Sequence, residues 1–353
     1  MLQERPILEL VNATRVIGFR RLRSLQRAHR LAWPNMINGY VLTRVVETLL
    51  NVGFFDELRK AGEVRPDAFA ESKNLDESIL RSLCDVLYAS HILEKDGEAY
   101  RLTDIGHLLI EFGRGWFNAE FGYEEVYHQL EPLLRKERQY GVDVRRRGDF
   151  VAKGSGEMGS LLYFPLAIDV IERQGYRHVF DLGCGDGTFL RHACQKVPGL
   201  QGYGIDLAAD AIADAHRLAR EEGLADRLQF LAQDITTINE TPEALRKVDV
   251  ATTFFVLHEV LHRGTAAVVS FLQAFRRAFP GVPLMIFEVD RLTLEEMRRR
   301  RPGMAIPYLL QHDLSHQKPI AKEGWRPIFE RAGFQSIEQR NLKFARLVIF
   351  TVY

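Results

Sequence analysis

The sequence predicts an α/β fold, in which a mostly helical first half precedes a doubly wound, mainly parallel sheet. Two observations carry this prediction. From residue 178 onward, short apolar runs typical of buried strands alternate with amphipathic helical segments, as in a parallel sheet covered by helices. Before residue 150, apolar residues recur mainly at helical spacing. We therefore expect two domains, residues 1–150 and residues 151–353.

Charge and composition restrict the class of protein. The 353 residues include 47 basic and 47 acidic side chains, so net charge gives no attraction to nucleic acid or to a membrane. No apolar run follows a basic start at the N-terminus, and none approaches the ~20 residues that span a bilayer. The cysteines, Cys84, Cys184 and Cys194, have no disulfide-scaffold or zinc spacing. These features predict a soluble cytoplasmic protein without nucleic-acid or membrane partners.

The first half has the order helix, strand, wing, strand. Residues 38–58 place apolar side chains at helical spacing, and residues 75–90 form an amphipathic helix. A hairpin is expected over residues 92–102, because its Asp96-Gly97 pair favours a tight turn. A long helical stretch over residues 118–138 follows. This order predicts a winged-helix-like domain.

A winged helix often binds DNA, so a DNA-binding protein is the alternative from another class. The helix that would enter the groove holds Asp76, Glu77 and Asp85 against the single Arg81. Neutralising DNA phosphates requires the opposite charge. We therefore expect this domain to form a homodimer and not to bind DNA.

A glycine turn lies at the centre of the second half. The strand Val179–Leu182 leads into Gly183, Gly185 and Gly187, which let the backbone turn sharply and approach a ligand closely. Dinucleotide enzymes use G-x-G-x-x-G with an acid about 20 residues later. Here the spacing is G-x-G-x-G, and Asp181 stands before the first glycine. That carboxylate suits a cationic ligand better than a phosphate.

Two further acids end the next strands. Asp206 follows the strand that begins at Gly202, and Asp234 follows the strand that begins at Leu228. In an open α/β sheet, ligands bind at the carboxyl ends of the strands, where all three acids meet. Each acid alone could be a helix cap or a turn former.

This pattern resembles the first motif of Rossmann-like class I S-adenosylmethionine-dependent methyltransferases. The resemblance implies that the Asp181 motif holds the methionine end of the cofactor, that Asp206 accepts the ribose hydroxyls, and that Asp234 meets the adenine amino group. The predicted cofactor-binding set consists of Asp181, Gly183, Gly185, Asp206, Leu207, Asp234, Ile235 and Phe255.

The whole chain is similar to the dimeric small-molecule O-methyltransferases. The resemblance rests on the winged helical half, the methyltransferase core, the His258-Glu259 pair after the fourth strand, and the closing Glu323-Gly-Trp and Ala332-Gly-Phe elements. In that family the pair is His-Asp and the histidine is the general base for a substrate hydroxyl. The resemblance also implies that the first domain serves as dimer contact and substrate lid.

The run His312-Asp313-Leu-Ser looks most like the metal-dependent 2-oxoacid C-methyltransferase branch, which acts on phenylpyruvate or 2-ketoarginine for β-methyl amino acid synthesis. The resemblance implies methylation of the β-carbon of a small 2-oxo acid, and a divalent or ferric ion, zinc or iron, bound by His258, Glu259 and His312. These three residues are also the predicted catalytic residues. Glu259 replaces an aspartate and could ligate, bridge or only orient. The proton acceptor stays open among Glu259, Asp313 and His316.

Two other enzyme functions stay open at the same histidine. A metal-free O-methyltransferase would use His258 as general base. The segment His258-Glu-Val-Leu-His262 also matches the zinc-protease pattern H-E-x-x-H, although it begins directly after a strand instead of inside a helix. The acids Glu120, Glu124 and Glu125, near two tyrosines, hint at a cationic substrate, and a solvated helix face explains them equally well.

Overall fold

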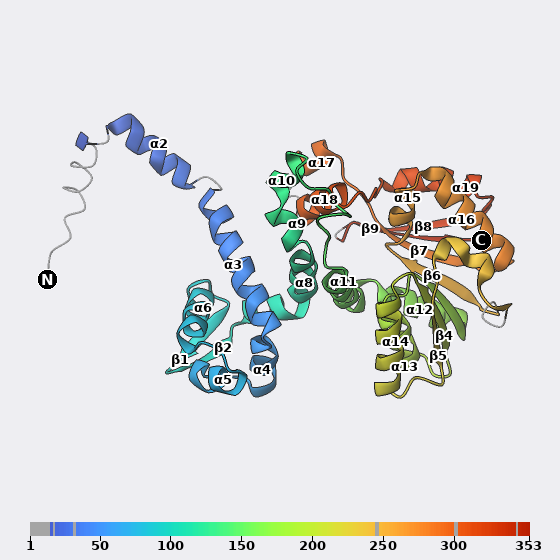
Figure 1. Cartoon of the computed structure of the whole chain (residues 1–353), viewed down its shortest axis with the longest axis horizontal. Coiled ribbons are helices and arrows are strands. Elements are labelled where there is room, and N and C mark those ends of the chain that lie inside the picture. Colours follow the sequence, from blue (N-terminus) through green and yellow to red (C-terminus); the bar gives the residue numbers. More distant parts are fainter. Residues whose placement is uncertain (1–14, 17, 31–32, 244–246, 300–302, 344) are drawn as a thin grey trace. The chain divides into compact units, whose positions relative to one another are not determined.

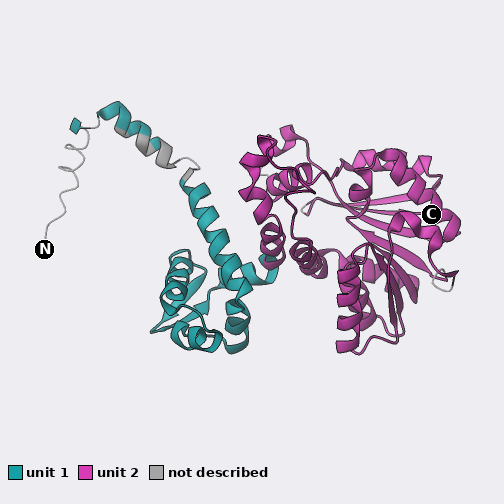
Figure 2. Ribbon diagram, in the orientation of Figure 1, with its two compact units in different colours: residues 1–113 teal, residues 114–353 magenta. Residues whose placement is uncertain are grey.

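The computed structural model describes residues 15–353 except 17, 31–32, 244–246, 300–302 and 344. The chain divides into two compact units, residues 1–113 and 114–353 (Figure 2). The expected boundary at residue 150 differs from this division, because the helices that follow residue 113 pack with the second unit. Gly115 and Gly154 bring the backbones of two such helices together: a Cβ on Gly154 would lie 2.4 Å from the Gly115 carbonyl oxygen.

The first unit is mostly helical, as expected. The predicted hairpin is confirmed, with Leu93 paired to Leu102 and Asp96 paired to Ala99 across the turn. Its elements are α2 (Phe19–Arg30), α3 (Trp33–Asn51), α4 (Phe54–Ala61), α5 (Pro66–Lys73), α6 (Glu77–Ala89), β1 (Leu93–Asp96), β2 (Ala99–Leu102), α7 (Asp104–Leu108) and the π-helical turn η1 (Leu109–Gly113).

The second unit begins with helices. They are α8 (Arg114–Gly122), α9 (Glu124–His128), α10 (Leu130–Leu134), α11 (Gly148–Leu162) and α12 (Phe164–Gln174). The helical stretch expected over residues 118–138 is present as three short helices, α8, α9 and α10, and the last of them ends at Leu134. Gly122 lies at the first break, where a Cβ would come within 2.6 Å of the Val151 side chain of α11. Close packing of α8 on α11 thus decides where the helix ends.

The rest of the second unit alternates strands and helices. The strands are β3 (His178–Leu182), β4 (Gln201–Asp206), β5 (Leu228–Ala232), β6 (Val250–Phe254), β7 (Leu284–Val289), β8 (Ile337–Leu342) and β9 (Leu347–Val352). The helices are α13 (Thr188–Lys196), α14 (Ala209–Glu221), η2 (Ile235–Glu240), α15 (Leu257–Leu261), α16 (Thr265–Ala278), α17 (Leu294–Arg299), α18 (Ala305–Leu314), η4 (Lys322–Gly324) and α19 (Trp325–Arg331).

These strands form one sheet in the order β5-β4-β3-β6-β7-β9-β8 (Figure 1). Strands β3 to β7 are parallel to one another, and β9 runs antiparallel to both β7 and β8. Along β3, Val179 packs into one apolar cluster and Phe180 into the other, so both faces are buried. The order reverses between β3 and β6, and such a switch point is where open α/β sheets bind ligands.

Candidate functional site

The glycine turn after β3 is tied to the end of β4. The backbone N–H groups of Gly183 and Cys184 donate to the Ile205 carbonyl at 2.8 and 3.0 Å. The N–H of Gly185 donates to Asp206 Oδ2 at 2.9 Å. Two predicted cofactor residues, Gly185 and Asp206, are therefore in direct contact.

Glycine is required at the first position of this turn. Gly183 has a φ of +78°, and a Cβ there would lie 2.5 Å from the Val256 side chain. The turn thus passes directly against the segment that leads from β6 into α15. Cys184 is buried and fills the space beside Gly204, as expected of a small apolar side chain.

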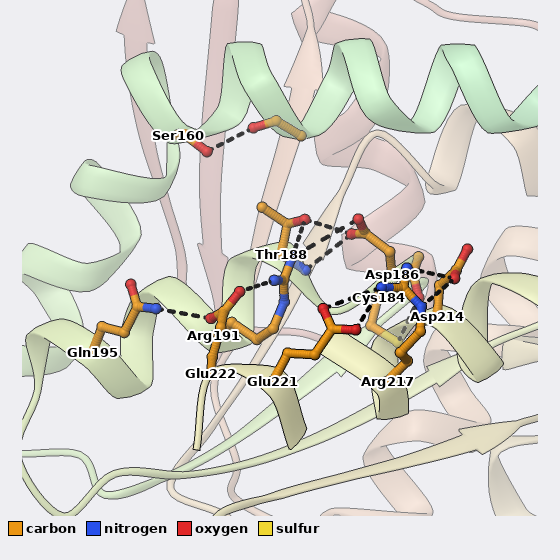
Figure 3. A network of polar contacts seen from close by, with 12 residues as sticks. Ser160, Cys184, Asp186, Thr188, Arg191, Gln195, Asp214, Arg217, Glu221 and Glu222 are labelled. Atoms are coloured by element: carbon orange, nitrogen blue, oxygen red, sulfur yellow. Dashed lines mark hydrogen bonds and ion pairs between the residues drawn. The ribbon is translucent and has the colours of Figure 1, made fainter. Parts of the chain in front are cut away.

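A polar network fixes the start of α13 behind the turn (Figure 3). Asp186 accepts hydrogen bonds from the backbone N–H of Thr188 at 3.1 Å and from its hydroxyl at 2.5 Å. The buried Arg191 donates to the Thr188 hydroxyl at 3.0 Å and pairs with Glu222. These bonds fix the conformation of the chain between the end of β3 and the start of α13.

Asp181 lies beneath the turn and is fully buried. Thr252 Oγ1 of β6 donates to its carboxyl group at 2.7 Å. Burial raises the pKa of Asp181 to about 7, against the opposing hydrogen bond from Thr252. Because a buried carboxylate without a cation is unfavourable, this group favours a positively charged ligand.

The two other strand-end acids lie where the sequence predicts them. Asp206 also accepts from the backbone N–H of Ala208 at 2.9 Å. Asp234 caps η2 by accepting from the N–H and the hydroxyl of Thr236, both at 2.8 Å. Capping and ligand binding are compatible here, since a carboxylate can accept about four hydrogen bonds.

The apolar members of the predicted cofactor set differ in exposure. Leu207 follows β4 and is 69% exposed, whereas Ile235 is buried beside Asp234. Phe255 has a φ of +60°, an uncommon conformation for a bulky residue. Its ring packs edge-on against Tyr163 at 4.8 Å. Such backbone strain clusters at functional sites, and Phe255 lies three residues before His258.

His258 occupies a buried position in α15, at 3% exposure. Its Nδ1 lies 2.7 Å from Glu288 Oε2, and its backbone N–H donates to Glu288 Oε1 at 3.3 Å. Glu288 is the penultimate residue of the otherwise apolar strand β7 and is completely buried. The carboxylate therefore fixes both the position and the orientation of the imidazole.

His312, on α18, lies beside His258. The ring centroids are 5.1 Å apart and the planes meet at 65°. The Nδ1 of His312 is 2.6 Å from the Tyr308 carbonyl, and a carbonyl can only accept, so Nδ1 carries the proton. Among the described residues, neither imidazole has a hydrogen-bond partner at Nε2. The structure thus brings the two predicted histidines together.

The pKa values of the two imidazoles are shifted in opposite directions. Burial acts to lower the pKa of His258, but the charge and hydrogen bond of Glu288 outweigh it and raise this pKa. Burial and the neighbouring His258 lower the pKa of His312 to about 3. His312 therefore stays neutral and presents a lone pair at Nε2.

Glu259 is engaged by two other side chains. Its Oε1 accepts from Arg146 at 2.8 Å and from Gln317 Nε2 at 2.5 Å. Arg146 also donates to the Tyr123 hydroxyl at 2.9 Å. In the part of the chain that the structure describes, no three side chains of histidine, cysteine, aspartate or glutamate come together as a metal-binding group. The expected three-residue ligand set is not assembled.

The remaining candidates lie at the surface. Asp313 pairs with Arg291 at 2.9 Å, and His316 is exposed with its ring against Tyr140. His262, the second histidine of the protease-like pattern, is exposed while His258 is buried. The five-residue helix α15 does not place both imidazoles at one buried site.

Two site residues were not predicted from the sequence, Glu288 and Arg146. An acid in the buried strand Leu284–Val289 was a detectable signal for Glu288, because such a group requires a buried partner. Arg146 belongs to a run of three arginines, and nothing in the sequence distinguishes it from its neighbours.

The chain is similar in sequence to known methyltransferases. Residues 175–333 match a family model described as a methyltransferase domain. The chain is 29% identical to the 2-ketoarginine methyltransferase of Streptomyces arginensis, over 86% of this chain and 88% of the relative. It is 27% identical to the indolepyruvate C-methyltransferase of Streptomyces griseus, over 88% and 91%.

The fold has counterparts among solved structures. Human N-acetylserotonin methyltransferase in complex with S-adenosylmethionine superposes with a TM-score of 0.62 at 18% identity, over 92% of this chain and 97% of that one. The fold is that of the Rossmann-like class I methyltransferases. The protein is an S-adenosylmethionine-dependent methyltransferase, similar to 2-ketoarginine and indolepyruvate C-methyltransferases in sequence and to small-molecule O-methyltransferases in fold.

Proposed function

We propose that the protein transfers the methyl group of S-adenosylmethionine to the β-carbon of a small 2-oxo acid. The observation that carries the proposal is the buried pair His258 and His312, whose ring centroids are 5.1 Å apart. Val256, which packs against Gly183 of the glycine turn, lies two residues before His258 in the chain. The relatives named for 2-ketoarginine and indolepyruvate support the substrate class. A role in β-methyl amino acid synthesis follows from that class of product.

The donor set of the two histidines fits a metal ion. Each Nδ1 is occupied, by Glu288 or by the Tyr308 carbonyl, and this leaves each Nε2 for a ligand. Metal-binding histidines commonly have such a fixed second nitrogen. A zinc or iron ion held by His258 and His312, with Glu259 as an outer partner, would supply polarisation of the keto group of a chelating 2-oxo acid.

The chain's own residues then place the reactants. The glycine turn with Asp181 and Asp206 holds the cofactor, and Arg146 offers a guanidinium to the substrate carboxylate. A C3 proton leaves to a base, the C3–CH3 bond forms, and the S–CH3 bond breaks to give S-adenosylhomocysteine. All three candidate acceptors are exposed. Glu259 pairs with Arg146, Asp313 pairs with Arg291, and the His316 ring packs against Tyr140.

A metal-free O-methyltransferase is the second candidate function. The His258–Glu288 contact at 2.7 Å favours it, because a carboxylate that orients an imidazole and stabilises its charged form is the arrangement of a general base. A substrate hydroxyl would then lose its proton to His258 Nε2 before attacking the methyl group.

We also propose a homodimer formed through the first unit, acting in the cytoplasm. Several apolar side chains of α3 are exposed in the single chain, among them Met36, Ile37 and Tyr40. On α6, Arg81 pairs with Glu77 and Glu98, which leaves little free positive charge for DNA. Among the described residues, no helix is long and apolar enough to span a membrane.

A panel assay tests the proposed function. Purified protein is incubated with methyl-labelled S-adenosylmethionine and with 2-ketoarginine, indolepyruvate and phenylpyruvate, beside phenol and catechol acceptors. Label transfer to a 2-oxo acid, lost after chelator treatment and restored by zinc or iron, is the expected result. Transfer to phenols alone, insensitive to chelator, would establish the O-methyltransferase instead.

A further inference from the structure

One buried hydroxyl on α18 has no hydrogen-bond partner. The Tyr308 side chain is half-buried, its oxygen Oη is fully buried, and this oxygen makes no hydrogen bond in the part of the chain that the structure describes. Two other buried tyrosines are paired: the Tyr100 hydroxyl donates to Asp85 at 2.5 Å, and the Tyr163 hydroxyl donates to the Ser155 carbonyl at 2.5 Å. Because buried polar atoms are nearly always paired in folded proteins, the Tyr308 hydroxyl indicates a contact with a ligand.

This hydroxyl belongs to the histidine site. The Tyr308 ring lies against the His312 imidazole, with the ring centroids 3.9 Å apart and the planes at 37°. The pKa of Tyr308 is raised, first by burial and then by the charge of Glu288, whereas Arg291 and Arg346 act in the opposite direction. The carboxylate that orients the other imidazole is thus the charge with the largest effect on this hydroxyl.

The chemistry of the hydroxyl matches a 2-oxo acid. A phenol whose pKa is raised keeps its proton at neutral pH, so Tyr308 is a hydrogen-bond donor and not the base for the C3 proton. A 2-oxo acid presents only hydrogen-bond acceptors at its keto and carboxylate groups. Since Arg146 is assigned to the carboxylate, the keto oxygen is the acceptor for the phenol. The negative charge of Glu288 stabilises the charged form of His258, so it is not left unpaired beside an oxygen that becomes anionic.

We propose that the Tyr308 hydroxyl donates a hydrogen bond to the C2 oxygen of the 2-oxo acid and stabilises the enolate that forms there. This inference rests on the proposed function. When the C3 proton leaves to a base, the electron pair of the C–H bond forms the C2–C3 double bond and the C2 oxygen becomes negative. Attack of C3 on the methyl group restores the keto group. The tyrosine keeps its proton throughout, and its hydrogen bond is strongest while the C2 oxygen carries charge.

Tyr308→Phe tests this role, because it removes the hydroxyl and keeps the ring against His312. Methyl transfer is measured with 2-ketoarginine, indolepyruvate and phenylpyruvate. We expect the single-turnover rate to fall by about 100-fold, the loss typical of removing one donor to a developing oxyanion. KM should stay the same, because the interaction is made mainly in the transition state. Tyr100→Phe, which removes a paired hydroxyl of the first unit, is the matched control and should keep the rate.

Stability distinguishes a hydroxyl that contacts a ligand from one with a structural role. Tyr100→Phe should lower the midpoint of urea unfolding, because it removes a hydrogen bond. Tyr308→Phe should leave the midpoint unchanged or raise it, because it removes a buried polar atom that has no partner among the described residues. A lower midpoint for Tyr308→Phe overturns the proposal, since the hydroxyl would then be paired within the folded protein.

The outcomes separate this inference from the proposed function. If the wild-type protein methylates a 2-oxo acid and Tyr308→Phe does so at the same rate, only the role of Tyr308 fails. If the wild-type protein methylates no 2-oxo acid, the proposed function fails and the role of Tyr308 fails with it. Tyr308→Phe should keep the wild-type affinity for S-adenosylhomocysteine in calorimetry and the wild-type metal content in elemental analysis. A loss of either overturns the inference, because the tyrosine would then act through the cofactor site or through His312.

Discussion

Replacing Glu288 by glutamine tests how the histidine site is held. The amide keeps the volume and one oxygen, which can still accept from the His258 backbone N–H, but it removes the charge that faces Nδ1. One buried hydrogen bond to a charged group is lost or replaced by a poorer one. We expect the free energy of unfolding to fall by about 2–3 kcal/mol. The exposed Glu338→Gln on β8 is the matched control and should change it by less than about 0.5 kcal/mol.

The same substitution reverses a pH dependence. In the wild-type protein the pKa of His258 is raised above 6.5, so its contribution to stability is full below 6.5 and is lost as pH rises through the folded value. Without Glu288, burial and Arg146 both lower the pKa of His258. The contribution then disappears as pH falls through 6.5 instead.

Urea unfolding at pH 5.5, 6.5 and 7.5 measures both effects. The difference in unfolding free energy between wild type and Glu288→Gln should be largest at pH 5.5 and shrink as pH rises. If wild type and Glu288→Gln have the same free energy of unfolding at all three pH values, the role assigned to the His258–Glu288 contact is refuted.

Three further predictions concern the cofactor turn and the second histidine. Because the pKa of Asp181 is about 7, the affinity for S-adenosylmethionine measured by calorimetry should increase as pH rises from 6 to 8. Asp181→Asn should abolish this increase, and Asp210→Asn, at an exposed acid, should keep it. An affinity of the wild-type protein that does not change with pH would contradict the assignment. Gly183→Ala should lose about 1–3 kcal/mol more stability than Gly199→Ala, since both have positive φ but a Cβ meets a neighbour at Gly183 alone; equal losses would be inconsistent with the close approach to Val256. His312→Ala should reduce zinc and iron content to background in elemental analysis, whereas His262→Ala should retain it; the reverse result would support the protease-like pattern.

Local sequence features predicted much of the sheet and the positions of the acids at its strand ends. Apolar runs bounded by glycine and acids marked β3 to β7, because buried parallel strands need apolar side chains on both faces. Asp181 and Asp206 could be placed together for the same reason. Parallel strands end at one edge, so residues at the ends of neighbouring strands meet there.

Contacts between distant segments could not be predicted this way. The His258–Glu288 contact depends on the register of β6 against β7, and the Arg146–Glu259 pair depends on where the chain between α10 and α11 packs. The division of the helical stretch 118–138 into separate helices depends on the packing of Gly115 and Gly122 against α11. Periodicity along one segment carries no information about these long-range partners.

The fate of the transferred methyl carbon tests the central claim most directly. With [methyl-13C]S-adenosylmethionine and 2-ketoarginine, carbon NMR of the product distinguishes a methyl group bonded to a C–H carbon from a methoxy group. The account predicts a labelled methyl group coupled to a single remaining proton on C3. A methoxy signal, or no transfer to any 2-oxo acid by protein that binds S-adenosylhomocysteine, would contradict it.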